Sequence, residues 1–273
     1  MLLVTGSNGQ LGRCLFKEFP GALFAGKDVL DIADSKAVSD FIRSNGIDTI
    51  INCAAYTAVD AAEDNPLMAR QVNELGVANL ARSSAKIIHI STDYVFDGRK
   101  SFPYLESDPP DPLNVYGKTK FDGERALFKY AESAIVIRVG WLYSTYGNNF
   151  VKTIMRLAAN SGTLRIISDQ IGTPTSALDL ARLIKFLIPV LDDGVCGIYH
   201  FSNEGVASWY DFARKICKLS GLNCNIVPIE SKDYPQKAKR PSFSVLNKSK
   251  IKSDFNISIL HWEEALEQCL NQF

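Results

Sequence analysis

The sequence has no excess of charge of either sign, because 30 lysines and arginines balance 30 aspartates and glutamates. Binding to nucleic acid or to an anionic membrane through general electrostatic attraction needs a basic excess. We therefore expect neither nucleic acid nor a membrane as a partner. A local basic pocket for a phosphorylated ligand is compatible with this composition.

Long apolar runs are also missing. The longest candidate, Leu180 to Leu191, contains Arg182 and Lys185, whereas a bilayer span needs about 20 predominantly apolar residues. Met1 to Val4 enters a glycine-rich stretch without the basic region or the cleavage site of a secretory signal. We therefore expect a cytoplasmic protein.

The sequence lacks paired cysteines, because its six cysteines are scattered along the chain. The six cysteines form no Cys-x-x-Cys pair, and none has a zinc-like spacing to His89, His200 or His261. Reduced thiols in the core are the ordinary state of such residues in the cytosol. The sequence therefore predicts no disulfide framework and no metal site.

The most informative segment that is present is the first twelve residues. The apolar run Met1 to Thr5 leads into Gly6-Ser7-Asn8-Gly9-Gln10-Leu11-Gly12. Three glycines at a spacing of three, between a strand and a helix, let the backbone turn tightly and approach a pyrophosphate at the positive end of the helix. The spacing differs from the commoner Gly-x-Gly-x-x-Gly, but it predicts the same kind of dinucleotide-binding loop.

Two acidic residues follow at the distance where such proteins contact the ribose or the adenine. Asp28 and Asp31 are both available for this contact. Lys27 adjoins them and favours a 2′-phosphate. The predicted cofactor is therefore NADPH or NADH, and the residues leave the choice open.

Strand-like and helix-like segments alternate through the first half of the chain. Strands are expected near residues 1–5, 22–25, 47–52, 87–91 and 135–139. Between them, Asp34 is placed to cap one helix, a second helix begins near Pro66, and a third covers Tyr116 to Tyr130. This alternation predicts an α/β protein with a Rossmann-type doubly wound parallel sheet.

The pattern becomes irregular after Trp141. A helix near Ala177 to Pro189 and a strand at Ile198 to Phe201 are expected to rejoin the sheet. We therefore predict a dinucleotide-binding domain over residues 1–150, with 176–203 rejoining it. A smaller, discontinuous C-terminal substrate lobe is expected from residues 151–175 and 204–273.

Tyr116 and Lys120 stand four residues apart, so on a helix their side chains share one face. They follow a long loop rich in proline, glycine and aspartate over residues 97–113. Ser91 and Thr92 end the preceding strand. All these groups are expected to converge at the C-terminal edge of the sheet, where a dinucleotide binds.

This grouping indicates carbonyl reduction. A free tyrosine has a pKa of about 10, and a nearby lysine ammonium would lower the pKa of Tyr116. Tyr116 would then act as general acid toward a carbonyl oxygen during hydride delivery. Thr92 would hydrogen-bond the same oxygen, and Lys120 would also hold the nicotinamide ribose. The sequence therefore predicts a nucleotide-dependent redox enzyme.

Several motifs together resemble the extended short-chain dehydrogenase/reductases, and within them the dTDP-4-dehydrorhamnose reductases. The motifs span nearly the whole chain: Gly6 to Gly12, Asn52 to Asp60, Ser91 to Phe96, Pro112 to Lys120, Trp141 to Tyr143, Gly147 to Phe150, Gln170 to Thr175, and Arg240-Pro241. The resemblance implies a soluble oxidoreductase that supplies dTDP-L-rhamnose for polysaccharide biosynthesis, although whether the product enters a polysaccharide or a small glycoside is left open.

The resemblance also implies the site. Thr92, Tyr116 and Lys120 form the implied catalytic group. With the glycine loop, the expected cofactor-binding residues are Gly6, Asn8, Gly9, Gln10, Leu11, Gly12, Asp31, Ile32, Ala54, Ala55, Tyr56, Ser91, Tyr116 and Lys120. The expected substrate-binding residues are Val59, Asp93, Tyr94, Trp141, Gln170 and Arg240. A guanidinium such as Arg240 matches a diphosphate bidentately.

The implied reaction is reduction of the C4 carbonyl of dTDP-4-dehydro-6-deoxy-L-mannose to dTDP-L-rhamnose, with a dTDP-sugar as the partner. Three alternatives stay open. The first is a reductase for another nucleotide-linked keto-sugar. The second is a nucleotide-sugar epimerase or dehydratase, although dehydratases place Asp-Glu after the threonine and here Asp93-Tyr94 follows Thr92. The third is a non-catalytic subunit resembling the regulatory β subunit of methionine adenosyltransferase.

The sequence departs from the family pattern in two places. Some members dimerise through a magnesium ion held partly by a glutamate in the first helix, and Cys14 occupies the corresponding position here. Since magnesium prefers carboxylate oxygen, we expect a monomer or a homodimer not bridged in this way. Phe243 and Val245 stand where the family often has polar or basic residues, so nucleotide-sugar contacts there are expected to differ.

Overall fold

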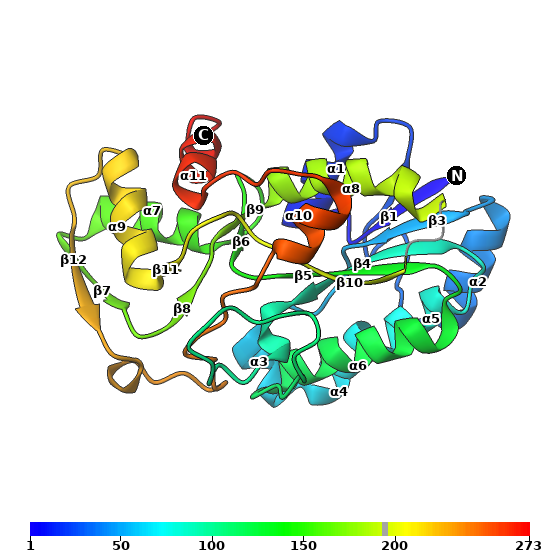
Figure 1. Cartoon of the computed structure of the whole chain (residues 1–273), viewed down its shortest axis with the longest axis horizontal. Helices are drawn as coiled ribbons and strands as arrows, with labels where there is room; N and C mark the ends of the chain where they lie inside the picture. Colours follow the sequence, from blue (N-terminus) through cyan, green and yellow to red (C-terminus); the bar gives the residue numbers. More distant parts are fainter. Residues whose placement is uncertain (193–195) are drawn as a thin grey trace.

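A computed structural model describes residues 1–192 and 196–273 of the chain. Six parallel strands form its central sheet, in the order β10-β5-β4-β3-β1-β2 (Figure 1). Their bounds are Leu2–Thr5 (β1), Leu23–Ala25 (β2), Thr49–Asn52 (β3), Lys86–Thr92 (β4), Ala134–Val139 (β5) and Gly197–Phe201 (β10). The predicted strands are therefore present, and the expected doubly wound parallel sheet is confirmed.

Helices cover both faces of this sheet because successive apolar side chains of its strands point in opposite directions. On one face, Val4 and Ile51 pack with α1 (Gln10–Glu18) and α8 (Ala177–Asp192). On the other face, Leu3 and Ile50 pack with α2 (Ser35–Ser44), α5 (Val77–Ala81) and α6 (Val115–Tyr130). Figure 1 shows the two helical layers above and below the sheet.

Two side chains cap the first turns of helices α2 and α6. Asp34 accepts hydrogen bonds from the backbone N–H groups of Lys36 and Ala37 at 3.0 and 2.9 Å, so it caps α2 as predicted. Asn114 caps α6 by accepting from the Gly117 N–H at 2.8 Å. This second cap places Tyr116 in the first turn of α6, next to the end of β4.

The predicted helix from Pro66 contains a stretch of π-helix. It runs as α4 (Pro66–Arg70), the π-helical η1 (Gln71–Gly76) and then α5, after the short α3 (Val59–Asp64). Asn73, in η1, accepts from the Tyr56 N–H at 2.8 Å and donates to the Tyr56 carbonyl at 3.1 Å. Its amide also donates to Thr119 Oγ1 at 3.1 Å. The wide turn therefore fixes the segment after β3, as π-bulges near functional sites often do.

A second hydrophobic core lies at the other end of the molecule (Figure 1). It is built by α7 (Phe150–Asn160), α9 (Trp209–Leu219) and α11 (Trp262–Leu270). The parallel pair β7 (Thr163–Ile167) and β12 (Asn225–Ile229) flanks these helices. The remaining short elements are η2 (Asp93–Val95), β6 (Leu142–Tyr143), β8 (Ile171–Gly172), β9 (Thr175–Ser176), β11 (Ala207–Ser208), η3 (Ser231–Asp233) and α10 (Ser249–Phe255).

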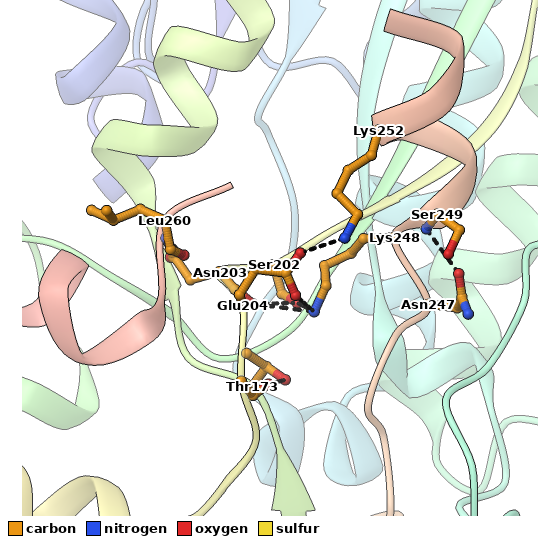
Figure 2. Close-up of polar contacts among 10 residues, drawn as sticks. Thr173, Ser202, Asn203, Glu204, Asn247, Lys248, Ser249, Lys252 and Leu260 are labelled. Carbon is orange, nitrogen blue, oxygen red and sulfur yellow. Dashed lines mark hydrogen bonds and ion pairs between the residues drawn. The ribbon is translucent and has the colours of Figure 1, made fainter. Parts of the chain in front are cut away.

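The element α10 lies within the predicted substrate lobe, yet it packs on the sheet, with Ile251 buried in the first core. Figure 2 shows how its start is held: Lys248 donates to the Asn203 carbonyl at 3.2 Å and pairs with Glu204 at 3.4 Å. Lys252 pairs with the same carboxylate at 2.8 Å. The lobe boundaries stay a prediction, and part of the segment 176–203 lies outside the described residues.

The helix α8 continues through Pro189 to Asp192, past its predicted end, because Leu187 and Leu191 are both buried in the first core. Tertiary packing here outweighs the intrinsic cost of proline inside a helix. Among residues 1–192 and 196–273, none of the helices combines the length and the hydropathy that crossing a bilayer requires.

Candidate active site

A cleft of about 1530 Å³ opens at the C-terminal edge of the sheet, where β1, β3, β4 and β5 end. Ligands of open α/β sheets bind at this edge. All fourteen positions proposed for the cofactor line the cleft: Gly6, Asn8, Gly9, Gln10, Leu11, Gly12, Asp31, Ile32, Ala54, Ala55, Tyr56, Ser91, Tyr116 and Lys120. Thr92 and four of the substrate-side candidates, Val59, Asp93, Tyr94 and Trp141, line it as well.

Two glycines of the loop, Gly6 and Gly12, have no room for a side chain. Gly6 has a φ of +64°, and a Cβ atom on it would lie 2.6 Å from the Ala54 nitrogen. A Cβ atom on Gly12 would lie 2.6 Å from Ser7 Cα. Gly9 precedes the first residue of α1 and donates its N–H to the Gly6 carbonyl at 3.0 Å. The loop thus presents bare backbone and a helix N-terminus to the cleft, which fits the pyrophosphate of a dinucleotide.

The part of the cleft formed by the residues after β2 carries charges of both signs. Lys27, Asp28 and Asp31 all line it. Lys27 Nζ lies 3.7 Å from Asp31 Oδ2, and Asn8 donates to Asp28 Oδ1 at 3.2 Å. A carboxylate suits a ribose hydroxyl and an ammonium suits a 2′-phosphate, so both forms of the cofactor have a matching group here.

Thr92 and Tyr116 meet in the cleft. A hydrogen bond with Thr92 lowers the pKa of Tyr116, but burial outweighs it and raises that pKa to about 12. The Thr92 hydroxyl also donates to Asp93 Oδ1 at 3.2 Å and accepts from the Tyr94 N–H at 3.1 Å. The expected lowering of the Tyr116 pKa is therefore wrong for this structure, because loss of solvation dominates.

Lys120 is held from behind the cleft. Its ammonium donates to the Ile90 carbonyl at 2.6 Å and lies 3.3 Å from His89 Nε2. Burial lowers the pKa of Lys120 to about 8, whereas Glu124 and Cys53 favour the charged form. Lys120 is thus a buried amine that gains or loses its charge near neutral pH, one helical turn from Tyr116.

Ser91 lines the cleft, but its hydroxyl donates to Glu124. The same carboxylate forms a buried bidentate pair with Arg138, at 3.0 and 2.7 Å. The Ser91 hydroxyl is therefore already hydrogen-bonded to a buried carboxylate of the protein.

The substrate-side candidates fall into two groups. Asp93 and Tyr94 are packed against the catalytic candidates: the Tyr94 ring lies edge-on to Tyr116, with centroids 5.8 Å apart. Burial raises the pKa of Asp93 to about 6. Gln170 and Arg240, in contrast, do not line the cleft.

Both of these outlying side chains are already engaged. Gln170 is buried and donates to Ser231 Oγ at 3.0 Å. Arg240 makes a bidentate pair with Asp60, at 2.6 and 3.1 Å between nitrogen and oxygen. In this structure Asp60 takes the position at Arg240 that the sequence assigns to a diphosphate.

An aromatic stack closes one side of the cleft. Trp141 follows β5 with a φ of +51°, a left-handed conformation that is rare for so large a residue. Its ring stacks on Trp209, with centroids 3.5 Å apart and planes within 5°. A Cβ atom on Gly172 would lie 2.6 Å from the Trp141 ring. Trp209 belongs to none of the sequence motifs, and its one local signal is its place directly after the capping serine of α9.

Comparison with known proteins shows the family to which the chain belongs. Residues 1–273 match the family model described as RmlD substrate binding domain. A dTDP-4-dehydrorhamnose reductase of Aggregatibacter actinomycetemcomitans is 42% identical, over 97% of each chain. The spore coat polysaccharide biosynthesis protein SpsK of Bacillus subtilis is 38% identical, over 99% of this chain and 97% of that protein.

Solved structures show the same relationship. A dTDP-4-dehydrorhamnose reductase of Clostridium acetobutylicum superposes with a TM-score of 0.96 at 37% identity, covering 99% of this chain and 98% of that one. The Bacillus anthracis enzyme in complex with NADP gives 0.95 at 35% identity, over 100% and 99% of the two chains. The chain therefore belongs to the RmlD family of dTDP-4-dehydrorhamnose reductases.

Proposed function

We propose that this protein reduces the C4 carbonyl of dTDP-4-dehydro-6-deoxy-L-mannose with NADPH or NADH, giving dTDP-L-rhamnose, and that Tyr116 is the proton donor. Family membership supports the reaction. The observation that carries the assignment of roles is the meeting of Thr92 and Tyr116 beside Lys120, at the edge of the sheet where the glycine loop opens.

The residues present fit a nicotinamide dinucleotide. The bare backbone of the glycine loop and the N-terminus of α1 would hold its diphosphate, and Asp31 or Lys27 its adenosine ribose. Ala54, Ala55 and Tyr56 would line its path toward Lys120, with Asn73 fixing the backbone of Tyr56. When bound, the reduced nicotinamide supplies the hydride that adds to the carbonyl carbon.

Tyr116 carries the proton that it would give to the carbonyl oxygen. Since burial raises its pKa to about 12, the phenol is fully protonated at neutral pH and acts as a hydrogen-bond donor. The Thr92 hydroxyl would turn its one proton from Asp93 to the same oxygen, which stabilises the negative charge that develops there. Lys120 would favour loss of the phenolic proton through its positive charge.

The aromatic stack would bind the sugar and exclude water. Trp141 presents its ring at the cleft, and Trp209 behind it prevents the ring from turning away. Asp93 and Tyr94 would contact the sugar on the opposite side of Tyr116. For Arg240 to bind the diphosphate of the substrate, Asp60 must first release its guanidinium.

The test is oxidation of NADPH or NADH, followed by its absorbance, with the keto-sugar nucleotide generated in situ. We expect the Tyr116→Phe variant to lose about 10²- to 10⁴-fold in kcat, the usual contribution of a general acid. The matched control is Tyr210→Phe, because Tyr210 is half-buried in α9 and does not line the cleft.

Chromatography of the product would identify the sugar. Full activity in Tyr116→Phe would contradict the role of the phenol. An absence of turnover with either cofactor, while calorimetry still shows nucleotide binding, would contradict the reaction and favour a regulatory subunit or another keto-sugar.

A further inference from the structure

Three buried polar side chains lie in a row behind the cleft. Asn52 ends β3, His89 lies beside it on β4, and Lys120 reaches them from α6. Their exposed fractions are 1%, 0% and 2%. The proposed reaction uses only Lys120, so the other two need a separate explanation.

Backbone geometry fixes the orientation of the Asn52 amide. The Ala54 N–H, which can only donate, points at Asn52 Oδ1 at 3.1 Å. The Thr5 hydroxyl donates to the same oxygen at 2.7 Å. The Asn52 NH₂ group must therefore face His89 Nδ1, which lies 3.0 Å away. Since an amide NH₂ has no acceptor to offer, Nδ1 accepts and carries no proton.

The tautomer of His89 follows from this bond. A neutral imidazole has one proton, which must then lie on Nε2, the atom 3.3 Å from Lys120 Nζ. Burial and the neighbouring Lys120 keep the pKa of His89 well below its ordinary value, so the ring stays neutral. An Nε2–H cannot bond to an ammonium, which has no lone pair, but it can donate to an uncharged amine.

The geometry points to Asn52 and His89 as a positioning pair for Lys120: Asn52 locks the tautomer of His89, and the Nε2–H of His89 favours the uncharged amine until an anionic dinucleotide in the cleft draws a proton onto Lys120. The inference rests on the proposed role of Lys120. It predicts that binding the dinucleotide is coupled to proton uptake from solvent, which approaches one proton only at alkaline pH.

The other groups around Lys120 set the limits of this effect. Glu124, one turn along α6, and Cys53, after β3, favour the ammonium, whereas burial opposes it. Glu124 is itself paired with Arg138, which weakens its influence. The Ile90 carbonyl accepts from either form of Lys120. The imidazole is therefore the neighbour whose hydrogen bond depends on the protonation state of Lys120.

The first experiment is ¹⁵N NMR of the wild-type protein labelled in its histidine rings. With only three histidines, a His89 variant suffices to assign the signals. We expect His89 to show an unprotonated Nδ1 and a protonated Nε2 from mildly acidic to mildly alkaline pH. A protonated Nδ1, or an imidazolium, would overturn the inference without any measurement of turnover.

The second experiment measures proton uptake. Calorimetric titration of the full-length protein with NADPH in buffers of different ionisation enthalpy gives the number of protons taken up. We expect uptake to be greatest at mildly alkaline pH. In Asn52→Asp, one carboxylate oxygen keeps the bonds from Ala54 and Thr5, and the other demands a proton on Nδ1. Nε2 then accepts from the ammonium, so uptake should move to higher pH by about one unit or more.

The matched control is Thr5→Val, which removes one donor to Asn52 Oδ1 but leaves the bond from Ala54. The control should keep the wild-type tautomer and the wild-type proton uptake. Equal uptake in wild type and Asn52→Asp would refute the coupling. Because the ring spectrum and the calorimetry need no sugar substrate, failure of the proposed reaction would be seen separately, as lack of turnover with both results intact.

Discussion

Removing the carboxylate of Glu124 is expected to destabilise the protein strongly. The Glu124 and Arg138 side chains are only 2% and 1% exposed, and two hydrogen bonds of 3.0 and 2.7 Å join them. Glu124→Gln leaves the guanidinium buried without its counter-charge. Breaking a buried pair by removal of one partner typically costs about 3–5 kcal/mol.

This cost converts into a shift of the melting temperature. An unfolding entropy of about 2.1 cal/mol/K per residue gives roughly 0.57 kcal/mol/K for 273 residues. A loss of 3–5 kcal/mol therefore lowers Tm by about 5–9 °C. Differential scanning calorimetry of the purified variant measures this shift directly.

Two controls separate the charge from the packing. Ser91→Ala removes only the hydroxyl that donates to Glu124, and should cost about 1 kcal/mol, or about 2 °C. The double variant Glu124→Gln with Arg138→Met removes both charges and should recover most of the loss, because no unpaired guanidinium is left buried and the introduced amide carbonyl can still accept from Ser91. If Glu124→Gln melts within about 1 °C of the wild type, the reasoning is refuted.

Three further predictions concern the candidate site. Gly12→Ala places a Cβ atom 2.6 Å from Ser7 Cα, so calorimetry should detect no NADPH binding; retained affinity would show that the loop can shift. Burial raises the pKa of Asp93 to about 6, above its unfolded value of about 3.9, so this carboxyl costs stability increasingly as pH rises through that window. Asp93→Asn should therefore raise the free energy of unfolding by on the order of 2 kcal/mol at pH 8 and leave it unchanged at pH 4, and an equal gain at both would count against this account. If Arg240 meets the substrate diphosphate, Asp60→Asn should tighten dTDP binding about fivefold by removing a competitor, whereas an unchanged Kd would argue against that contact.

Local signals in the sequence were sufficient for the scaffold. The cap at Asp34 and the apolar runs of the strands depend on neighbours within a few residues, and the structure confirms them. The approach of Tyr116 to Thr92 also followed from local rules, because parallel strands end at one edge and Asn114 starts the helix there.

Contacts between distant residues, and the extent to which side chains are buried, could not be predicted from the sequence. The partner of Arg240 is Asp60, 180 positions away, and no pattern in the sequence links the two. Trp209 reaches the cleft only because α9 packs at its mouth. The direction of the Tyr116 pKa shift was predicted wrongly because the loss of solvation depends on how completely the surrounding segments cover the ring.

The π-helical turn between Gln71 and Gly76 has a consequence for how this chain can change over evolution. A π-helical turn holds one residue more than an α-helical turn, so deletion of one residue there would restore ordinary α-helical winding and leave the later residues of the helix facing as they do now. Val77 and Leu80 would keep their places in the core beneath the sheet, whereas the Asn73 amide would lose its position at the backbone of Tyr56. The extra residue can therefore be lost without loss of the fold, and what its loss would disturb is the cleft.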